Sequence, residues 1–257
     1  MSKITNIFLH LLPENWQQKV RNKYYENKIS KVLSTEEPDL FVVKAIIKEG
    51  QTVVDIGANF GMYTRFLSEY TGNSGKVISF EPIKRSFLSL RHNVNFLQLQ
   101  NVDVYQFALS DEEKMVKMEI PDYNEGGENL YEARISKDTG GKNVEMVKTK
   151  ILDKVLANRK IHFIKIDVEG HELNVLKGAL EILEKQKPVL LVEINGGIKA
   201  GNENARQIAE LLLQFGYRPF RRFDQRLRRI EGDDDGFNYF FLNADHENQH
   251  REIISPR

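Results

Sequence analysis

The fold of this chain is decided by one stretch, residues 52–64, which reads Thr52-Val53-Val54-Asp55-Ile56-Gly57-Ala58-Asn59-Phe60-Gly61-Met62-Tyr63-Thr64. A short β-branched run opens it, as is typical of a strand buried on both faces of a parallel sheet. The amphipathic residues 62–70 then predict a helix packed on that sheet. Between them, Gly57 allows a sharp turn and the approach of a ligand, and Gly61 allows close contact between helix and strand. Together these features predict a cradle for a nucleotide-type cofactor.

The polar residues around the turn distinguish between two types of cofactor. A dinucleotide fingerprint needs a second glycine where this chain has Asn59. Asp55 would repel a pyrophosphate but suits a ligand with a positively charged amine and a sulfonium. Residues 76–82 predict a second strand that ends in Glu81, 24 residues after Gly57. A carboxylate there can accept hydrogen bonds from both ribose hydroxyls. The pattern indicates S-adenosylmethionine.

Alternating strands and helices predict a seven-stranded, mostly parallel sheet with helices on both faces, a Rossmann-like α/β fold. The remaining parallel strands are expected at 102–107, 161–168 and 188–194, and the remaining helices at 36–49, 84–99, 171–184 and 204–215. Residues 218–223 and 237–242 have no helix between them. They should form an antiparallel C-terminal hairpin around the turn at 232–236.

An insertion at about residues 111–150 breaks the alternation. Residues 114–120 and 144–152 each predict a strand, separated by the polar, glycine-rich residues 122–142. The insertion follows the third strand and should lie near the carboxyl ends of the strands, where ligands bind in open α/β sheets. It either holds residues that select the substrate or forms a structural hairpin.

A second motif carries acidic residues to the same edge of the sheet. It reads Phe163-Ile164-Lys165-Ile166-Asp167-Val168-Glu169-Gly170-His171-Glu172. A buried strand ends in Asp167, and a glycine turn then starts a helix. Asp167, Glu169, His171 and Glu172 should therefore lie at the carboxyl edge of the sheet. The first and fourth strands adjoin in this topology, so both motifs should face one cleft.

Several pieces of the chain resemble the FkbM family of S-adenosylmethionine-dependent methyltransferases. They are VVDIGANFGMYT, ISFEP, FALSD, FIKIDVEGHELNVLKGA and LLVEI, in the family's order and spacing from about residue 50 to residue 195. The resemblance implies a Rossmann-like class I methyltransferase fold. It also implies methyl transfer, usually to an oxygen of a sugar, polyketide or similar small hydroxylated acceptor.

The resemblance further implies roles for single residues. Near the amino acid part of the cofactor it puts Asp55, Gly57, Asn59 and Gly61, and at the ribose Glu81. Beside the adenine it puts Ala108, Leu109, Ser110 and Asp111. Asp167 would lie near the methyl group, with Glu169, His171 and Glu172 beside the acceptor.

Three parts of the chain are expected: an N-terminal helical extension at 1–35, a methyltransferase domain at 36–245 and a polar, loose tail at 246–257. An apolar helical face at 4–12 is followed by basic residues up to Lys31. This pattern favours a lid or a homodimer element over a basic helix that rests on a membrane surface.

The composition is ordinary for a soluble globular protein. Apolar residues make up 40% and charged residues 29% of 257 residues, enough for one large domain. Basic and acidic residues balance at 37 each, so no net charge argues for nucleic acid. The absence of cysteine excludes disulfides, thiolate catalysis and zinc–thiolate sites, and it fits a cytoplasmic protein. No apolar run reaches the roughly 20 residues of a membrane span, and no signal peptide is expected.

Methyl transfer is an in-line displacement at a carbon that the sulfonium already activates. Positioning the acceptor oxygen can supply roughly 7–11 kcal/mol, and a general base adds typically ~10²–10⁴-fold. His171 is the candidate base because a histidine titrates near neutral pH. It could instead point to solvent or cap its helix. Glu169 and Glu172 compete with it, although acids in a first helical turn also stabilise the helix dipole.

Other interpretations stay open. The acid cluster, with Glu193 as a further pocket candidate, could hold a divalent cation that orients a diol, although the spacing demands no metal. The arginines at 221–229 form either a solvated face or a clamp for an anionic acceptor. A nicotinamide-dependent oxidoreductase is the second enzyme hypothesis, against which Asp55 and Asn59 argue. The intact acidic motif argues against a cofactor-binding interaction module without catalysis.

Overall fold

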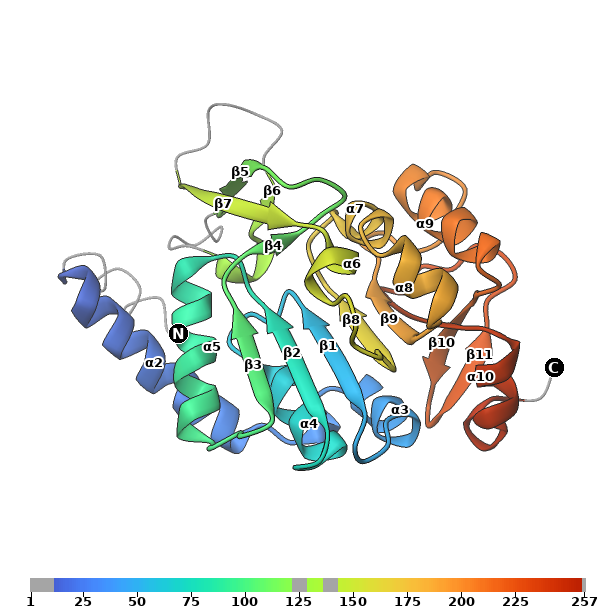
Figure 1. Ribbon diagram of the computed structural model, residues 1–257, viewed down its shortest axis with the longest axis horizontal. Coiled ribbons are helices and arrows are strands. Elements are labelled where there is room, and N and C mark those ends of the chain that lie inside the picture. Colours follow the sequence, from blue (N-terminus) through green and yellow to red (C-terminus); the bar gives the residue numbers. More distant parts are fainter. Residues whose placement is uncertain (1–11, 122–128, 136–142, 256–257) are drawn as a thin grey trace.

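The computed structural model describes residues 12–121, 129–135 and 143–255. They form a main sheet in the order β11-β10-β12-β9-β8-β1-β2-β3 (Figure 1). Its strands are β1 (Thr52–Ile56), β2 (Lys76–Phe80), β3 (Val102–Tyr105), β8 (Phe163–Ile166), β9 (Val189–Glu193), β10 (Arg218–Phe223), β11 (Arg226–Arg229) and β12 (Asn238–Leu242). The adjacent strands β9, β8, β1, β2 and β3 are parallel to one another, whereas β12 is antiparallel to both of its neighbours. The predicted Rossmann-like α/β fold is confirmed.

The predicted count of seven strands is wrong by one. The antiparallel pairing of 218–223 with 237–242 is present, with Phe220 opposite Phe240. However, β10 first turns at Asp224 and returns as β11. In β11 only Leu227 is fully buried among three arginines, so its sequence lacks the alternation that marks a strand. The predicted hairpin turn at 232–236 belongs to the connection from β11 to β12.

Helices cover both faces of the main sheet because each central strand is apolar on both sides. They are α3 (Asp39–Ile46), α4 (Met62–Thr71), α5 (Lys84–Phe96), α6 (Leu152–Val155), α7 (Glu172–Lys177), α8 (Leu180–Lys185) and α9 (Glu203–Gln214). Val54 and Ile56 of β1 pack in one core with α6 to α9. Val53, their neighbour on the strand, packs on the opposite face with α3 and α4. Helix α3 is shorter than the predicted helix at 36–49, because Pro38 precedes it and a 3-10 turn (Ser34–Glu36) stands before that.

The predicted helix at 171–184 is two helices, α7 and α8, which break at Gly178. A Cβ on Gly178 would lie 2.2 Å from the backbone oxygen of Ser110, so the segment that contains Ser110 passes directly against the break. Asp153 of α6 then accepts hydrogen bonds from two backbone N–H groups at the start of α8, at 2.9 and 3.0 Å. The break is therefore fixed by packing and by capping from outside the helix.

The insertion forms a second, four-stranded sheet above the arrowheads of β1, β2 and β3 in Figure 1. Its strands are β4 (Ala108–Leu109), β5 (Met115–Glu119), β6 (Arg134–Ile135) and β7 (Val144–Lys150), with a 3-10 turn at Leu130–Glu132. Met118, Leu130 and Val147 face inward and pack against Ile83, which follows β2. The predicted strands at 114–120 and 144–152 are confirmed, and much of the connection at 122–142 lies outside the described residues.

The N-terminal extension contributes helix α2 (Glu14–Lys31), which lies along α5 (Figure 1). Gln18 Nε2 donates to Ser89 Oγ at 3.1 Å, and Tyr25 stacks on Phe60 with ring centroids 4.6 Å apart. Of the predicted apolar face at 4–12, only Leu12 lies within the described residues. Within the described ranges, no helix combines the length and apolar character that crossing a bilayer requires.

The prediction that the tail at 246–257 is loose is wrong for its described residues, 246–255. They belong to helix α10 (Ala244–Gln249) and a 3-10 turn (Arg251–Ile253). The side chain of Asn243 caps α10 by accepting from the backbone N–H of His246 at 3.0 Å. Ile253 is buried in the same core as Leu227 of β11, and Ile254 packs against that core. The backbone N–H of Ser255 donates to the carbonyl of Leu227 at 2.8 Å, so the segment is docked on β11.

Replacement of Gly178 should test whether the break between α7 and α8 is required by packing. Gly178→Ala would force a methyl group against the Ser110 carbonyl, and we expect a loss of about 1–3 kcal/mol in the free energy of unfolding, measured by urea titration. Gly201→Ala is the matched control, since a Cβ there meets no atom within 4 Å, and it should stay within about 0.5 kcal/mol. Equal effects of both changes would contradict the packing argument.

Candidate active site

A cavity of about 320 Å³ opens at the carboxyl edge of the main sheet. This volume is within the range of small-molecule sites. The β2–β3 side and the insertion supply apolar walls, which include Phe80, Phe107, Leu109 and Met118. The β8–β9 side is charged and is lined by Glu37, Lys165, Asp167, Glu169 and Glu193. The cavity therefore has one apolar and one acidic region.

The glycine turn after β1 lines the cavity, and Gly57 is required by a contact that the sequence did not reveal. A Cβ on Gly57 would lie 1.7 Å from the backbone oxygen of Asp167, so the turn and the end of β8 meet backbone to backbone. Gly57 and Asn59 both have positive φ, 79° and 51°. Gly61 begins α4, and its close contact is with Leu90 of α5 rather than with a strand.

Asp55 lies in the wall of the cavity at the end of β1 and is fully buried. Its Oδ2 accepts a hydrogen bond from Thr64 Oγ1 at 2.7 Å, whereas Oδ1 has no partner among the described residues. Burial raises the pKa of Asp55 against the opposing charge of Lys165. A buried acceptor without a donor costs roughly 1–3 kcal/mol, so this atom suits a donor that arrives with a ligand.

Glu81 lies just after β2 and ties the glycine turn to the next loop. Its two carboxylate oxygens accept hydrogen bonds from the backbone N–H groups of Asn59 and Ile83, each at 2.9 Å. Burial raises the pKa of Glu81 to about 8, although both N–H groups favour the ionised form. Each oxygen keeps a second lone pair, so Glu81 can still accept hydrogen bonds from a ligand.

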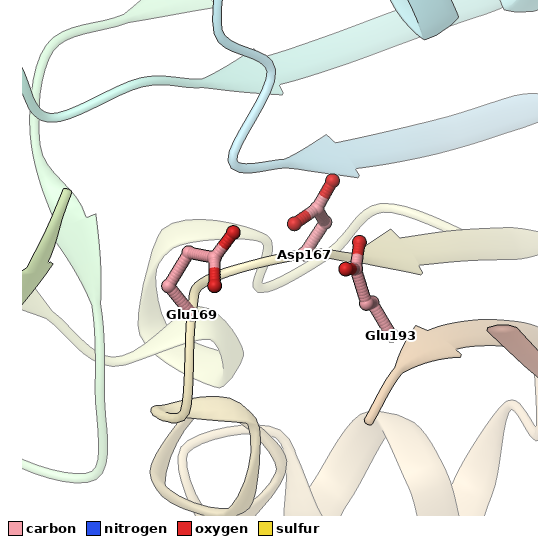
Figure 2. Close-up of side chains that lie close together, drawn as sticks. All are labelled: Asp167, Glu169 and Glu193. Atoms are coloured by element: carbon pink, nitrogen blue, oxygen red, sulfur yellow. The ribbon is translucent and has the colours of Figure 1, made fainter. Parts of the chain in front are cut away.

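Three carboxyl groups come together at the ends of β8 and β9 (Figure 2). Asp167 follows β8, Glu169 comes from the next turn, and Glu193 ends β9. One oxygen of each lies within 4.8 Å of the others. Burial and the neighbouring charge of Asp167 raise the pKa of Glu193 to about 8. The structure thus confirms that the acidic motif and the first turn face one cavity.

Lys165 lies next to this cluster of three carboxyl groups and was not among the predicted site residues. Its Nζ is 2.8 Å from Asp167 Oδ2 and lies over the ring of Tyr63, 4.6 Å from the centroid. Burial lowers the pKa of Lys165, but the charges of Asp167 and Asp55 outweigh it, so the net pKa is raised. A lysine within the apolar strand Phe163–Ile166 is a signal that could have identified it.

A divalent cation is the alternative ligand for the cluster of three carboxyl groups, since hard cations bind several carboxylate oxygens. The Lys165 ammonium already supplies a positive charge at Asp167, and the side chain of Asn195 donates to Glu169 Oε2 at 2.8 Å. The carboxyls therefore have cationic and hydrogen-bond partners from the chain itself. We assign no metal to them.

His171 lies among residues that the sequence placed beside the adenine. Its Nε2 is 2.9 Å from Ser110 Oγ, which is 3.0 Å from Asp111 Oδ1. Asn174 Nδ2 also donates to Asp111 Oδ1 at 3.0 Å. Burial lowers the pKa of His171, so the ring is neutral at pH 7. His171 lines the cavity, but Ser110 and Asp111 lie behind it and do not.

Glu172 lies outside the cavity lining, although the sequence placed it beside the acceptor. It is 1% exposed and accepts hydrogen bonds from the Gly170 N–H at 2.8 Å and from Asn204 of α9 at 3.5 Å. Burial raises the pKa of Glu172. Its contacts hold the glycine turn and dock α9, which is a structural arrangement.

Glu37 and Asn238 complete the acidic region from opposite ends of the chain. Asn238 Nδ2 donates to Asp39 Oδ2 at 2.9 Å, and Arg222 Nε donates to the other oxygen of Asp39 at 2.9 Å. Neither Glu37 nor Asn238 belongs to a recognisable motif. Among the described residues, none of the arginines at 221–229 lines the cavity, and Arg221 pairs with Asp234 at 3.1 Å. This arrangement favours the solvated hairpin face over the anion clamp.

Comparison with known proteins identifies the family of this chain. The chain matches the family described as Methyltransferase FkbM domain over residues 55–219, which is more than half of its length. The protein belongs to this family. The predicted resemblance is confirmed, and the cavity is the candidate active site of an FkbM-family methyltransferase.

Three proteins similar to this chain differ in how much of their length it covers. Methyltransferase 1 of Beauveria bassiana is 24% identical over 143 residues, which cover 49% of this chain and 57% of that protein. Methyltransferase FkbM from Methylobacillus flagellatus has 18% identity and a TM-score of 0.48, covering 74% of this chain and 43% of that one. This chain therefore spans less than two thirds of the length of either. A methyltransferase from Aquifex aeolicus has 20% identity and a TM-score of 0.45, covering 84% and 96%.

Removal of the Glu172 carboxyl group should test its structural role. Glu172→Ala leaves the Gly170 N–H without its acceptor, and we expect a loss of about 1–3 kcal/mol in the free energy of unfolding. Glu172→Gln keeps one acceptor oxygen and should lose less. Glu184→Ala, on the exposed side of α8, is the control for side-chain truncation. Unchanged stability in Glu172→Ala, measured by urea titration, would return Glu172 to the list of candidate bases.

Proposed function

We propose that this protein transfers a methyl group from S-adenosylmethionine to an oxygen of a small hydroxylated acceptor, such as a sugar or a polyketide. The observation that carries the proposal is the unpartnered Oδ1 of Asp55 in the wall of the cavity, with Glu81 after the adjacent strand. The first suits the ammonium of the amino acid part of the cofactor, and the second suits its ribose hydroxyls.

The remaining walls fit the same cofactor. Phe80, Phe107 and Leu109 offer apolar surface for an adenine ring. When bound, S-adenosylmethionine supplies a methyl group on a sulfonium, so the protein's own residues need only position the acceptor and accept its proton. The sulfonium is cationic, which is compatible with the acidic region formed by Asp167, Glu169 and Glu193.

The acidic region supports a hydroxylated acceptor. Carboxylates accept hydrogen bonds from hydroxyl groups, and Asn238 can both donate and accept. Among the described residues that line this region, Lys165 is the cation beside four carboxyl groups, those of Glu37, Asp167, Glu169 and Glu193, so an anionic phosphate would meet like charges. We therefore expect a neutral polyol-type acceptor. An assay with methyl-labelled cofactor and panels of neutral and phosphorylated sugars tests this, and transfer to phosphorylated sugars alone would contradict it.

Calorimetric titration with S-adenosylmethionine, S-adenosylhomocysteine and NAD tests the cofactor. We expect the first two to bind and NAD not to bind. Asp55→Asn removes the charge opposite the cofactor's ammonium, and it should weaken binding about 10- to 100-fold, since a hydrogen bond to a charged group contributes about 1.5–3 kcal/mol. Asp224→Asn, in the exposed β10–β11 turn, is the matched control.

The other outcomes of this titration are equally informative. Binding of NAD alone would favour the oxidoreductase, for which Asp55 is poorly placed because it would face a pyrophosphate. No binding of any of the three would favour a non-catalytic interaction module. Equal binding by the parent and Asp55→Asn would show that Asp55 does not face the cofactor.

A further inference from the structure

Asp167 and Glu193 form a pair at the carboxyl ends of two adjacent parallel strands. β8 and β9 run in register, with Ile166 opposite Val192, so the next residues on each strand are Asp167 and Glu193. Figure 2 shows the Glu193 carboxyl directed toward that of Asp167. Like charges this close in a partly buried site repel each other, so the negative charge of Asp167 disfavours ionisation of Glu193. The pKa of Glu193, raised to about 8, fits a shared proton at neutral pH.

We propose that Asp167 and Glu193 act as one proton-accepting pair, which releases its shared proton when S-adenosylmethionine binds and takes the proton of the acceptor hydroxyl as the methyl group is transferred. This proposal rests on the proposed function. It assigns the role of general base to Asp167 together with Glu193. Glu193 lies outside the acidic motif of the sequence.

The charges around the pair explain why a cationic cofactor would matter. The groups around it come from the neighbouring elements: Lys165 on β8, Glu169 in the following turn, Glu172 on α7, Asp55 on β1, Glu81 after β2, Glu37 before α3, the neutral Tyr63 on α4 and Asn238 on β12. Only Lys165 is cationic among these described groups. An added positive charge therefore favours loss of the shared proton.

Lys165 is a positioning residue in this arrangement. Its ammonium holds Asp167 Oδ2 at 2.8 Å and is itself held between Asp167 and Asp55. It stays protonated because these carboxylates keep the pKa of Lys165 high, so it orients the pair without competing for the proton. His171 is less suited to the role of base because its Nε2 is engaged by Ser110 at 2.9 Å.

Protons and charges balance over the reaction. The pair is doubly ionised before transfer. A lone pair of the acceptor oxygen forms the bond to the methyl carbon, the carbon–sulfur bond breaks with both electrons on sulfur, and the hydroxyl proton passes to the pair. The acidic region thus loses the sulfonium charge and gains a proton in the same event, so the net charge around Lys165 is unchanged.

Proton release on binding tests the proposal without any acceptor. Calorimetric titrations at pH 7, in two buffers of different ionisation enthalpy, give the number of protons released. We expect up to about one proton with S-adenosylmethionine and far less with neutral S-adenosylhomocysteine. Glu193→Gln and Asp167→Asn should bring the release close to zero while binding persists. Glu184→Gln, on the exposed side of α8, should release as the parent does.

A second readout covers the case in which a variant fails to fold. The infrared band of protonated carboxyl groups should be present in the parent at pH 7, with a contribution from Glu81, whose pKa is also raised to about 8. It should lose intensity when S-adenosylmethionine is added, and an unchanged intensity would overturn the proposal.

Three further results would overturn the proposal. One is cofactor binding without proton release. Another is release that persists in Glu193→Gln, which would assign the proton to Glu81. The third is release that requires added Mg²⁺, which would make the carboxyls a metal site. Failure of the parent to bind the cofactor at all is a separate result, because it overturns the proposed function and this proposal with it.

Discussion

The active site depends on one backbone contact, between Gly57 after β1 and the carbonyl of Asp167 after β8. Any side chain at position 57 would overlap that carbonyl, since a Cβ would lie 1.7 Å from it. This contact brings the turn that carries Asp55 and Asn59 against the turn that carries the acidic motif. The two turns, which follow neighbouring strands, therefore line one cavity. Gly57 is therefore required by the packing of the protein's own backbone, independently of any ligand.

The second constraint is electrostatic. Asp55 and Lys165 lie opposite each other on β1 and β8, and both are buried in the sheet. Buried charges are costly unless they are paired, and Lys165 is paired with Asp167 at its outer end. Asp55, Lys165, Asp167 and Glu193 form a row that runs from β1 across β8 to β9. A charge that a ligand brings to one end of this row is therefore felt at the other end through short distances in a partly buried site.

The sequence predicted the fold well because its central strands are apolar runs bounded by glycine turns. It failed where an element depends on a few contacts. Strand β11 depends on Leu227, the docked tail on Ile253 and Ile254, and the break between α7 and α8 on the contact of Gly178 with Ser110. Each of these depends on a partner distant in sequence, which periodicity cannot show.

Within the site, the motifs predicted which turns line the cavity, but not which of their side chains face it. The structure joins Asp167 and Glu169 with Glu193, as the strand order requires, but it places Glu172 behind the turn and His171 beside Ser110. Spacing along the chain cannot distinguish these cases, because residues 167–172 leave the strand in a turn with two positive φ angles, at Glu169 and Gly170. That turn sends consecutive side chains in different directions.

The family match does not include all of the residues that complete the acidic region. It covers residues 55–219, whereas Glu37 precedes it and Asn238 follows it. Helix α2, also outside the match, stacks Tyr25 on Phe60 of the glycine turn, and Lys28 donates to Tyr131 of the insertion at 3.2 Å. Under the proposed function, the acceptor is bordered by Asp167, Glu169 and Glu193 within the match and by Glu37 and Asn238 outside it. Substrate choice is therefore expected to involve residues 12–46 and β12, about which the family match carries no information.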